Sequence, residues 1–420
     1  MSNKASYSNI REFTESISMS AAYNNGCRPN ELTYHLYLKE LFNDYSLQLD
    51  KDWKKVPFAP EKSTFSSIVI QCHEYANKLM REILHAVDAY KRGNPSEASE
   101  IFNVAMNEIF PYLMELRILH CDNNERWDLF EKLCQCSHSH LFRVRRLENS
   151  RVSVDEMRHP PFELANKIPP ERFSVQGVPC LYLGSTIYVC VQEVGIESSD
   201  FETSSMQKLY ASRYWWNRKE NDTTAFLELF LRPEQFAEFY ARLPDRFDSQ
   251  GLYGEIPIRN FILSYLIVWP LQLACSIPVV KHQKVENVNE HEEYIVPQLL
   301  MMWLKCQKNE KDGVFHGICY QSTKIPQNLF NKKPAFFLNY AIPVFTNEKK
   351  GFCEKVGKLF DITFPFCIMV NEDCSFDNLR RMEGIIDQEY PLNPDPYFMP
   401  REFKSLLDKS GNAIRDNQRE

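Results

Sequence analysis

The chain lacks the short motifs that mark the common nucleotide-binding and hydrolase folds. Its 420 residues contain no GxxxxGK[ST] loop, no GxGxxG turn after a strand, no HExxH and no GxSxG. Repeats of fixed period and low-complexity tracts are missing as well. These absences argue against the common nucleotide-binding folds, the zinc proteases, the serine hydrolases and the repeat proteins.

Concentrated positive charge is also missing. The formal net charge is −7, and no long run of Lys or Arg occurs. Proteins that bind nucleic acid need a concentrated basic face, because their affinity depends on contacts to phosphates. Nucleic acid is therefore not expected as a partner.

The chain shows no clear export signal and no uninterrupted membrane span. The first residues, MSNKASYSNIREF, are polar, and the 13 cysteines are odd in number and scattered, so reduced thiols in a cytoplasmic protein are expected. The stretch 261–280 is long enough to cross a bilayer, but Pro270 and Gln272 interrupt it and no basic cluster flanks it. A buried helix or strand–turn–helix of a soluble core is favoured, and no membrane partner is expected.

The N-terminal third predicts helices. Apolar residues at steps of three or four predict an amphipathic helix over 64–91, and Pro95 opens a second helix that is expected to run to about Leu119 with a kink at Pro111. Two shorter helices are predicted over 31–44 and 125–136. We expect an all-α domain over 1–137.

From His138 onward the pattern changes to short apolar runs separated by turn residues. Five runs predict strands: HLFRVRRL, PCLYLGS, TIYVCVQEVG, FHGICYQS and AFFLNYAIPVF. Helices are predicted over 233–242 and 294–308. The fold class expected is α+β, with a catalytic domain over 138–350 and an extension over 351–420 that packs on it and ends in a polar tail.

Two local clusters each allow two interpretations. The run CQCSHSH (134–140) holds four possible zinc ligands, but its spacing does not match a zinc finger, so no metal site is expected. The run RYWWNRKEND (213–222) could stack on a base, but a helix that buries its aromatic side chains is favoured.

The strongest constellation is dispersed along the chain. Arg143, Arg172, Tyr182, Glu193 and Ser322 are polar residues within or beside apolar runs. The pattern RFSxxGxPCLYLGxS…E, followed much later by EEYIVPQLLMMWLK and FHGICYQSTK, resembles the RES domain, a family named for its Arg, Glu and Ser. The resemblance covers about 142–345 and leaves out the helical N-terminal third.

The resemblance implies an ADP-ribosyltransferase-like fold, with a split sheet and a cleft for NAD. It also implies NAD degradation by phosphorolysis or hydrolysis, and a helix-turn-helix antitoxin as partner, as several members of the family are toxins. NAD would be the substrate, with inorganic phosphate as a co-substrate and no resident cofactor. Homo-oligomers stay open.

The chemistry of NAD cleavage suits these residue types. Breaking the bond between nicotinamide and ribose gives an oxocarbenium-like transition state, which a carboxylate stabilises, and Glu193 fits that role. Arg143 and Arg172 suit pyrophosphate or attacking phosphate, because a guanidinium pairs with two oxygens. Tyr182 could stack on nicotinamide or bond a ribose, and Ser322 could orient the ribose or the nucleophile.

Each of these residues also has a plainer reading. Arg145 could replace Arg143, because strand alternation puts both on one face. Arg172 could form a structural ion pair with Glu193, Tyr182 could be a core residue, and Ser322 could cap a turn.

The chain departs from the shorter members of the family. Where they often carry GRWN it has ERFSVQG, with Ser174 in place of Asn, and long insertions separate Glu193 from Ser322. The choice between phosphorolysis and hydrolysis stays open. Two rival functions are an ADP-ribosyltransferase that modifies a macromolecule and a non-catalytic protein that binds a nucleotide.

Overall fold

The computed structural model divides into two compact units, each built from three separated stretches. The described residues are 32–52, 62–113, 115–119, 140–147, 152–195, 209–217, 223–230, 258–279, 291–307, 315–325, 334–345, 348–368, 406–407 and 413–414. One unit, here the helix-rich unit, combines Met1–Arg117, Pro169–Gln176 and Ala225–Thr323, and the other, the strand-rich unit, combines Ile118–Ile168, Gly177–Thr224 and Lys324–Glu420. The three consecutive ranges predicted from the sequence group the chain differently and stay a prediction.

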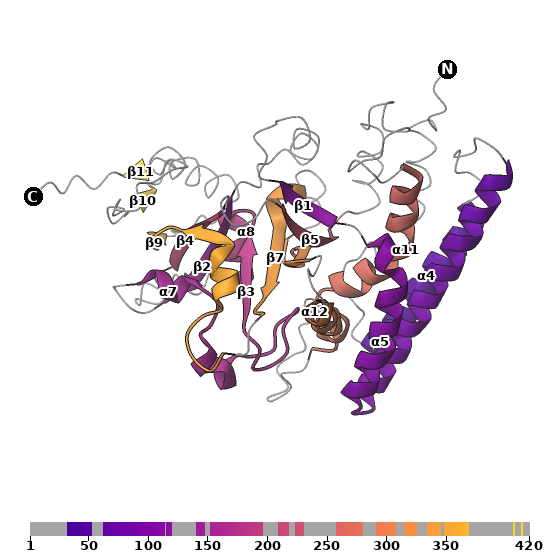
Figure 1. Cartoon of the computed structure of the whole chain (residues 1–420), viewed down its shortest axis with the longest axis horizontal. Helices are drawn as coiled ribbons and strands as arrows, with labels where there is room; N and C mark the ends of the chain where they lie inside the picture. The colour runs from indigo at the N-terminus through magenta and orange to yellow at the C-terminus, as the bar shows by residue number, and fades with distance from the viewer. Residues whose placement is uncertain are drawn as a thin grey trace, which may run out of the picture. The chain divides into compact units, whose positions relative to one another are not determined.

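The predicted helical pair is confirmed in the helix-rich unit. α4 (Lys62–Lys91) and α5 (Pro95–Ile109) lie side by side (Figure 1). α3 (Tyr34–Asp52) packs on α4. The α5 helix begins at Pro95 because the Asn94 side chain accepts a hydrogen bond from the backbone N–H of Glu97, at 3.2 Å.

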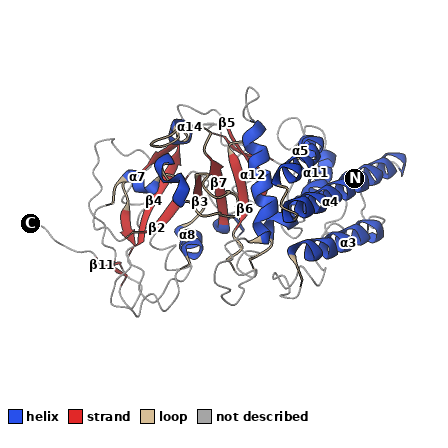
Figure 2. Cartoon of the chain, turned by 90° about the horizontal axis from the view of Figure 1, so that it is seen from below, coloured by secondary structure: helices blue, strands red, loops and turns tan. Residues whose placement is uncertain are grey.

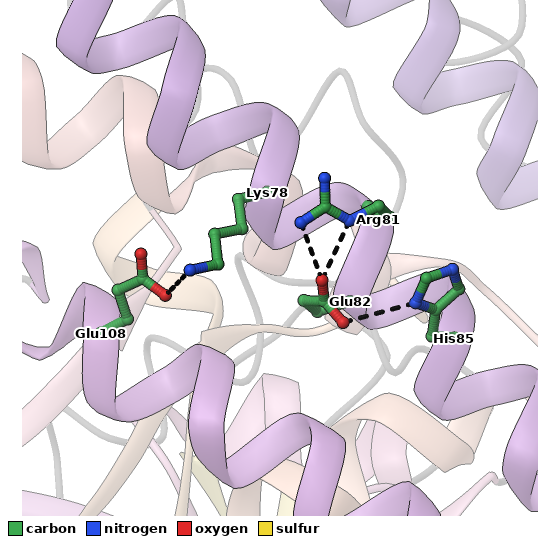
Figure 3. A network of polar contacts seen from close by, with 5 residues as sticks. All are labelled: Lys78, Arg81, Glu82, His85 and Glu108. Atoms are coloured by element: carbon green, nitrogen blue, oxygen red, sulfur yellow. Dashed lines mark hydrogen bonds and ion pairs between the residues drawn. The ribbon is translucent and has the colours of Figure 1, made fainter.

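Ion pairs decorate the outer faces of this helical pair. Lys78 of α4 reaches Glu108 of α5, whereas Arg81, Glu82 and His85 form a network within α4 (Figure 3). The Lys78 and Arg81 side chains are about half exposed, so these pairs add little to stability.

The second helix ends earlier than predicted. After Ile109 come a 3-10 turn, η2 (Phe110–Tyr112), and then a strand, β1 (Glu115–Leu119). Pro111 has no N–H to continue the helical hydrogen bonding. The backbone has the extended conformation at Leu113, where ψ is 135°. The prediction of a kinked helix to Leu119 was therefore wrong.

The apolar stretch near 261–280 forms a buried helix, as favoured. It is α11 (Ile258–Ser276), and it carries Pro270 inside it. Its described side chains from Tyr265 to Cys275 are buried, as expected for a helix that is apolar on all sides. Among the described residues, no helix has both the length and the apolar character needed to cross a membrane.

A turn with its following helix and a pair of strands also belong to the helix-rich unit. The turn η5 (Glu292–Tyr294) leads into α12 (Ile295–Gln307), which confirms the helix predicted over 294–308. The strands β5 (Thr223–Leu229) and β6 (Gly317–Gln321) pair in parallel, and β6 confirms the strand predicted in FHGICYQS.

The strand-rich unit is built on an antiparallel sheet in which β2, β3 and β7 confirm predicted strands. Neighbouring strands follow the order β7-β3-β2-β4 (Figure 2). Both β8 and β9 pair with β4. The strands are β2 (His140–Arg146), β3 (Cys180–Gly184), β4 (Leu209–Trp216), β7 (Leu338–Pro343), β8 (Phe360–Ile362) and β9 (Phe366–Ile368). The helices and 3-10 turns are α7 (Val154–Met157), η3 (Phe162–Lys167), α8 (Ile187–Val194), η6 (Pro334–Phe337) and α14 (Glu354–Lys358). A short pair, β10 (Leu406–Leu407) and β11 (Ala413–Ile414), follows.

Two predictions of secondary structure were wrong in this unit. TIYVCVQEVG forms the helix α8 rather than a strand, and the residues Arg213–Trp216 lie in strand β4 rather than a helix. The aromatic side chains Trp215 and Trp216 are buried, as expected, but on a strand. The helices predicted over 125–136 and 233–242 lie outside the described residues.

The chain is thus a mixed α/β protein in which helices accompany parallel and antiparallel strand pairs. The more specific ADP-ribosyltransferase-like fold stays a prediction.

Candidate functional site

Glu193 lies in the last turn of the short helix α8, which is fixed at both ends. At the start, the Thr186 hydroxyl accepts a hydrogen bond from the Val189 N–H and donates one to the Phe336 carbonyl, at 3.2 and 2.8 Å. At the end, Gly195 takes the left-handed conformation with φ of 70°, which ends helices at little steric cost. The helix therefore presents Glu193 at a defined position.

A close approach to Gly184 sets the side of the sheet on which α8 lies. A Cβ atom at Gly184, the last residue of β3, would stand 2.6 Å from Cys190 Sγ and 2.6 Å from Val189 Cγ1. Only a glycine leaves room for the helix there. The α8 helix thus covers the face of the sheet toward which a side chain at position 184 would point.

The Glu193 side chain has two polar neighbours, Asn339 and Lys324. Asn339 Nδ2 donates a hydrogen bond to Glu193 Oε1 at 2.6 Å, from a side chain that is 4% exposed. Lys324 Nζ donates to the Glu193 carbonyl oxygen at 2.6 Å and lies 3.6 Å from Oε2. The Glu193 side chain is 34% exposed, so its carboxylate is held in place and still open to solvent.

Strand pairing places Tyr182 on the same face as this group. Asn339 is paired with Gly184, and Tyr182 precedes Gly184 by two residues in β3, so all three positions share one face. The Tyr182 side chain is half-buried. Among the predicted site residues, Tyr182 and Glu193 are the two that this face of the strand-rich unit brings together.

Arg143 and Arg145 lie on the opposite face of the sheet. Phe142 pairs with Gly184, so its neighbour Arg143 points to the other side, and Arg145 follows it by alternation. An Arg143 guanidinium nitrogen lies 3.4 Å from the Tyr182 carbonyl, and one of Arg145 donates to the Glu156 carbonyl at 2.5 Å. Their assignment to the same ligand as Glu193 stays a prediction.

Burial governs the electrostatics of that second face. Burial lowers the pKa of both Arg143 and Arg145. The like charge of Arg145 lowers the pKa of Arg143 as well. Burial also raises the pKa of Tyr214 to about 12, against the neighbouring guanidinium groups. The Tyr214 hydroxyl donates to the Met157 carbonyl, which fixes the start of the chain segment after α7.

Arg172 and Ser322 belong to the helix-rich unit. Arg172 is 8% exposed and donates to the carbonyls of Cys275 and Ile277, at 3.1 and 3.0 Å, and to Thr323 Oγ1 at 3.2 Å. Its guanidinium also lies over the Tyr294 ring, 5.3 Å from the centroid. The Arg172 contacts are thus those of a cation that closes the end of α11, and the buried Ser322 follows β6 immediately.

Sequence reasoning missed Asn339 and Lys324. Asn339 is a single amide in the apolar run AFFLNYAIP, and Lys324 stands two positions after Ser322 in YQSTK. A lone amide in a buried strand needs a hydrogen-bond partner, so that signal was available. Among the described residues, no group of three His, Cys, Asp or Glu side chains is placed to hold a metal ion, and all of CQCSHSH except His140 lies outside them.

The fold and these contacts define a mixed α/β protein with a carboxylate held between a buried amide and an ammonium group. No family model matches the chain, and no solved structure matches it. Over 334 residues the chain is 29% identical to the Bacillus subtilis (strain 168) protein named "Putative toxin YopC", which covers 78% of the chain. The chain spans 64% of that relative's length. The likeness is to a protein named as a toxin, and the RES resemblance stays an expectation.

Proposed function

We propose that the chain is a toxin that consumes NAD, and that Glu193 is its catalytic carboxylate. The observation that carries the proposal is the Glu193 carboxylate itself, held by Asn339 and Lys324 at the end of a fixed helix and still 34% exposed. The name of the Bacillus subtilis relative and the resemblance to the RES domain both agree with a toxin.

The chemistry asks for one oriented carboxylate. In the transition state the ribose carries positive charge at C1′, and nicotinamide leaves as a neutral molecule without a general acid. The hydrogen bond from Asn339 fixes Oε1 of Glu193, so the carboxylate would need little reorganisation as the charge develops. Tyr182, on the same face, is available to pack on the nicotinamide ring or to bond a ribose hydroxyl.

A product assay tests the proposal. The purified chain is incubated with NAD, with and without inorganic phosphate, and the products are separated by chromatography. Glu193→Gln keeps the shape of the side chain and removes its charge, and we expect a loss of roughly 100-fold or more in nicotinamide release. Glu354→Gln is the matched control, because Glu354 is an exposed acid paired with Lys358 in the same unit.

The products separate the rival functions. Free ADP-ribose or its 1-phosphate supports the proposal, whereas label from NAD that appears only on a macromolecule supports an ADP-ribosyltransferase. NAD that stays intact with the wild-type chain, while still binding to it, contradicts the proposal and favours a non-catalytic nucleotide-binding protein.

A further inference from the structure

Lys324 places a positive charge beside the carboxylate, and the proposed function gives that charge no task beyond its contacts to Glu193. Its ammonium group lies 2.6 Å from the Glu193 carbonyl oxygen and 3.6 Å from Oε2 of the same residue. The shorter contact is to the carbonyl near the end of α8, where a cation is favoured by the helix dipole. The Lys324 side chain is 49% exposed, so a ligand in solvent can reach it.

We propose that Lys324 binds the group that attacks the ribose, and that it makes an anionic acceptor, inorganic phosphate, preferred over water. This inference rests on the proposed function. Lys324 is then the residue that determines acceptor specificity, whereas Glu193 serves cleavage with either acceptor.

The charges of Glu193 and Lys324 match those of the two reactants. When phosphate attacks the ribose, a cationic sugar faces an anionic acceptor. Glu193 and Lys324 form a pair of the same two charges, with the ammonium 3.6 Å from the carboxylate. The carboxylate stabilises the sugar and the ammonium stabilises the phosphate, whereas a neutral water molecule gives the ammonium nothing to neutralise.

The lysine side chain suits such an exchange of partners. It is a compact charge on a flexible stem, and it binds phosphate as a point charge. In the free chain Glu193 and its carbonyl hold the ammonium group close to where the acceptor would stand. When the Glu193 carboxylate pairs with the cationic sugar, the Lys324 ammonium group pairs with the phosphate anion instead.

The step balances without a further reactant. A phosphate oxygen forms a bond to C1′ of the ribose, and the bond from C1′ to the pyridinium nitrogen breaks. The electron pair of that bond goes to the nitrogen, which releases neutral nicotinamide. The other product is ADP-ribose phosphorylated at C1′, and no proton has to be transferred to the leaving group.

A purely structural role for Lys324 is the competing explanation, because its ammonium group also caps the end of α8. Three variants separate the two roles. Lys324→Gln keeps a donor and removes the charge, Lys324→Arg keeps the charge, and Lys358→Gln is the matched control from the exposed pair Lys358–Glu354. Nicotinamide release is measured against phosphate concentration for each, together with release in the absence of phosphate.

We expect Lys324→Gln to raise the KM for phosphate about 10-fold or more, which corresponds to roughly 1.4 kcal/mol of lost binding. Phosphate-independent release, which does not use the contact to phosphate, should fall by a smaller factor than release at low phosphate concentration. Lys324→Arg and Lys358→Gln should retain a KM near that of the wild-type chain. An unchanged KM for phosphate in Lys324→Gln, or an equal loss of both activities, would overturn the inference.

A binding measurement without NAD keeps this inference distinguishable from the proposed function. Phosphate should raise the Tm of the wild-type chain and of Lys324→Arg, and should not raise that of Lys324→Gln. Equal stabilisation of the wild-type chain and Lys324→Gln, or none for either, contradicts the inference whether or not NAD is cleaved. If the wild-type chain binds phosphate through Lys324 but leaves NAD intact, the proposed function is contradicted and the assignment of Lys324 as a phosphate-binding residue is not.

Discussion

At position 339 strand β7 carries an amide among apolar neighbours. A buried amide without a partner costs free energy, and here the partner of Asn339 is the Glu193 carboxylate. The contact therefore does two things: it satisfies the Asn339 donor and it limits the rotation of the carboxylate. Orientation of this kind is worth most when charge develops in a transition state.

Replacing Asn339 by Leu should lower NAD turnover about 10-fold or more, because Glu193 loses the donor that orients it. The unfolding midpoint should change little, since Leu fills a similar volume in a buried strand. Steady-state kinetics and thermal unfolding of the same preparation check both statements. Unchanged turnover in a well-folded variant would show that Asn339 has no positioning role.

His159 gives the strand-rich unit a dependence on pH. Its Nε2 accepts a hydrogen bond from the Cys353 N–H at 2.8 Å, and Nδ1 lies 2.8 Å from the Pro160 carbonyl, which fits a neutral ring protonated at Nδ1. Burial lowers the pKa of His159 below its usual 6.5, and nearby Arg143 and Arg158 lower it further. The Pro160 carbonyl and Glu348 act in the opposite direction.

Stability should therefore fall as the pH drops below about 6.5, where the unfolded chain takes up a proton that the folded chain resists. Urea midpoints at pH 7.5 and 5.5 test this with His159→Asn, which should show a smaller dependence on pH than the wild-type chain. The exposed His85 provides the control His85→Asn. An identical dependence in all three proteins would exclude His159 as the source.

At the scale of elements, α8 shows what the sequence could and could not predict. Its run IYVCV is rich in β-branched residues and suggested a strand. Thr186 before it and Gly195 after it are the capping residues of a helix, and packing against β3 and β2 decides for the helix. The run RYWW (Arg213–Trp216) suggested a helix by composition, but these residues pair with β2 and β8 and form a strand.

Gly184→Ala should destabilise the chain by about 1–3 kcal/mol, because the new Cβ would collide with Cys190 and Val189 of α8. Adding Cys190→Ala removes one of the two contacts, so the double variant should recover part of the loss. NAD turnover should fall in Gly184→Ala, because Glu193 belongs to α8, the helix that the new Cβ would displace. Denaturant unfolding of both variants measures the effect, and a Gly184→Ala chain as stable as wild type would contradict the packing described.

Arg172 should behave as part of the element that it closes. The last carbonyls of α11 have no partners within the helix, and Arg172 bonds to that of Cys275 and to Ile277 just beyond. Arg172→Met should lower the free energy of unfolding by roughly 2–4 kcal/mol, and Arg172→Lys by less. A fully stable Arg172→Met chain that has lost affinity for NAD would instead support the role in substrate binding predicted from the sequence.

For the molecule as a whole, the sequence indicates the classes of several elements, whereas their grouping rests on contacts between distant residues. The helical pair, four strands (β2, β3, β6 and β7) and the two buried helices α11 and α12 follow from periodicity and composition. The grouping of Ala225–Thr323 with the N-terminal helices depends on contacts between distant residues. Examples are the hydrogen bonds from the Tyr34 hydroxyl to the Ala274 carbonyl and from Trp303 Nε1 to Asn107, each 2.9 Å.

The candidate site shows the same limit. Glu193 and Tyr182 were predicted from the sequence, and strand register puts Tyr182 on the face where Asn339 contacts Glu193. Arg143 was assigned with them, but a one-residue offset along β2 puts its side chain on the other face. Asn339 and Lys324 could not be assigned to Glu193 without the pairing of β7 with β3 and the position of α8.

A toxin of the proposed kind stops growth by consuming NAD through Glu193. The most direct measurement is the NAD content of growing cells after induction of the chain, of Glu193→Gln and of Glu354→Gln. We expect NAD to fall before growth stops with the wild-type chain and with Glu354→Gln, and we expect Glu193→Gln to change neither NAD content nor growth. Growth that stops while NAD stays constant, or equal toxicity of Glu193→Gln, would contradict it.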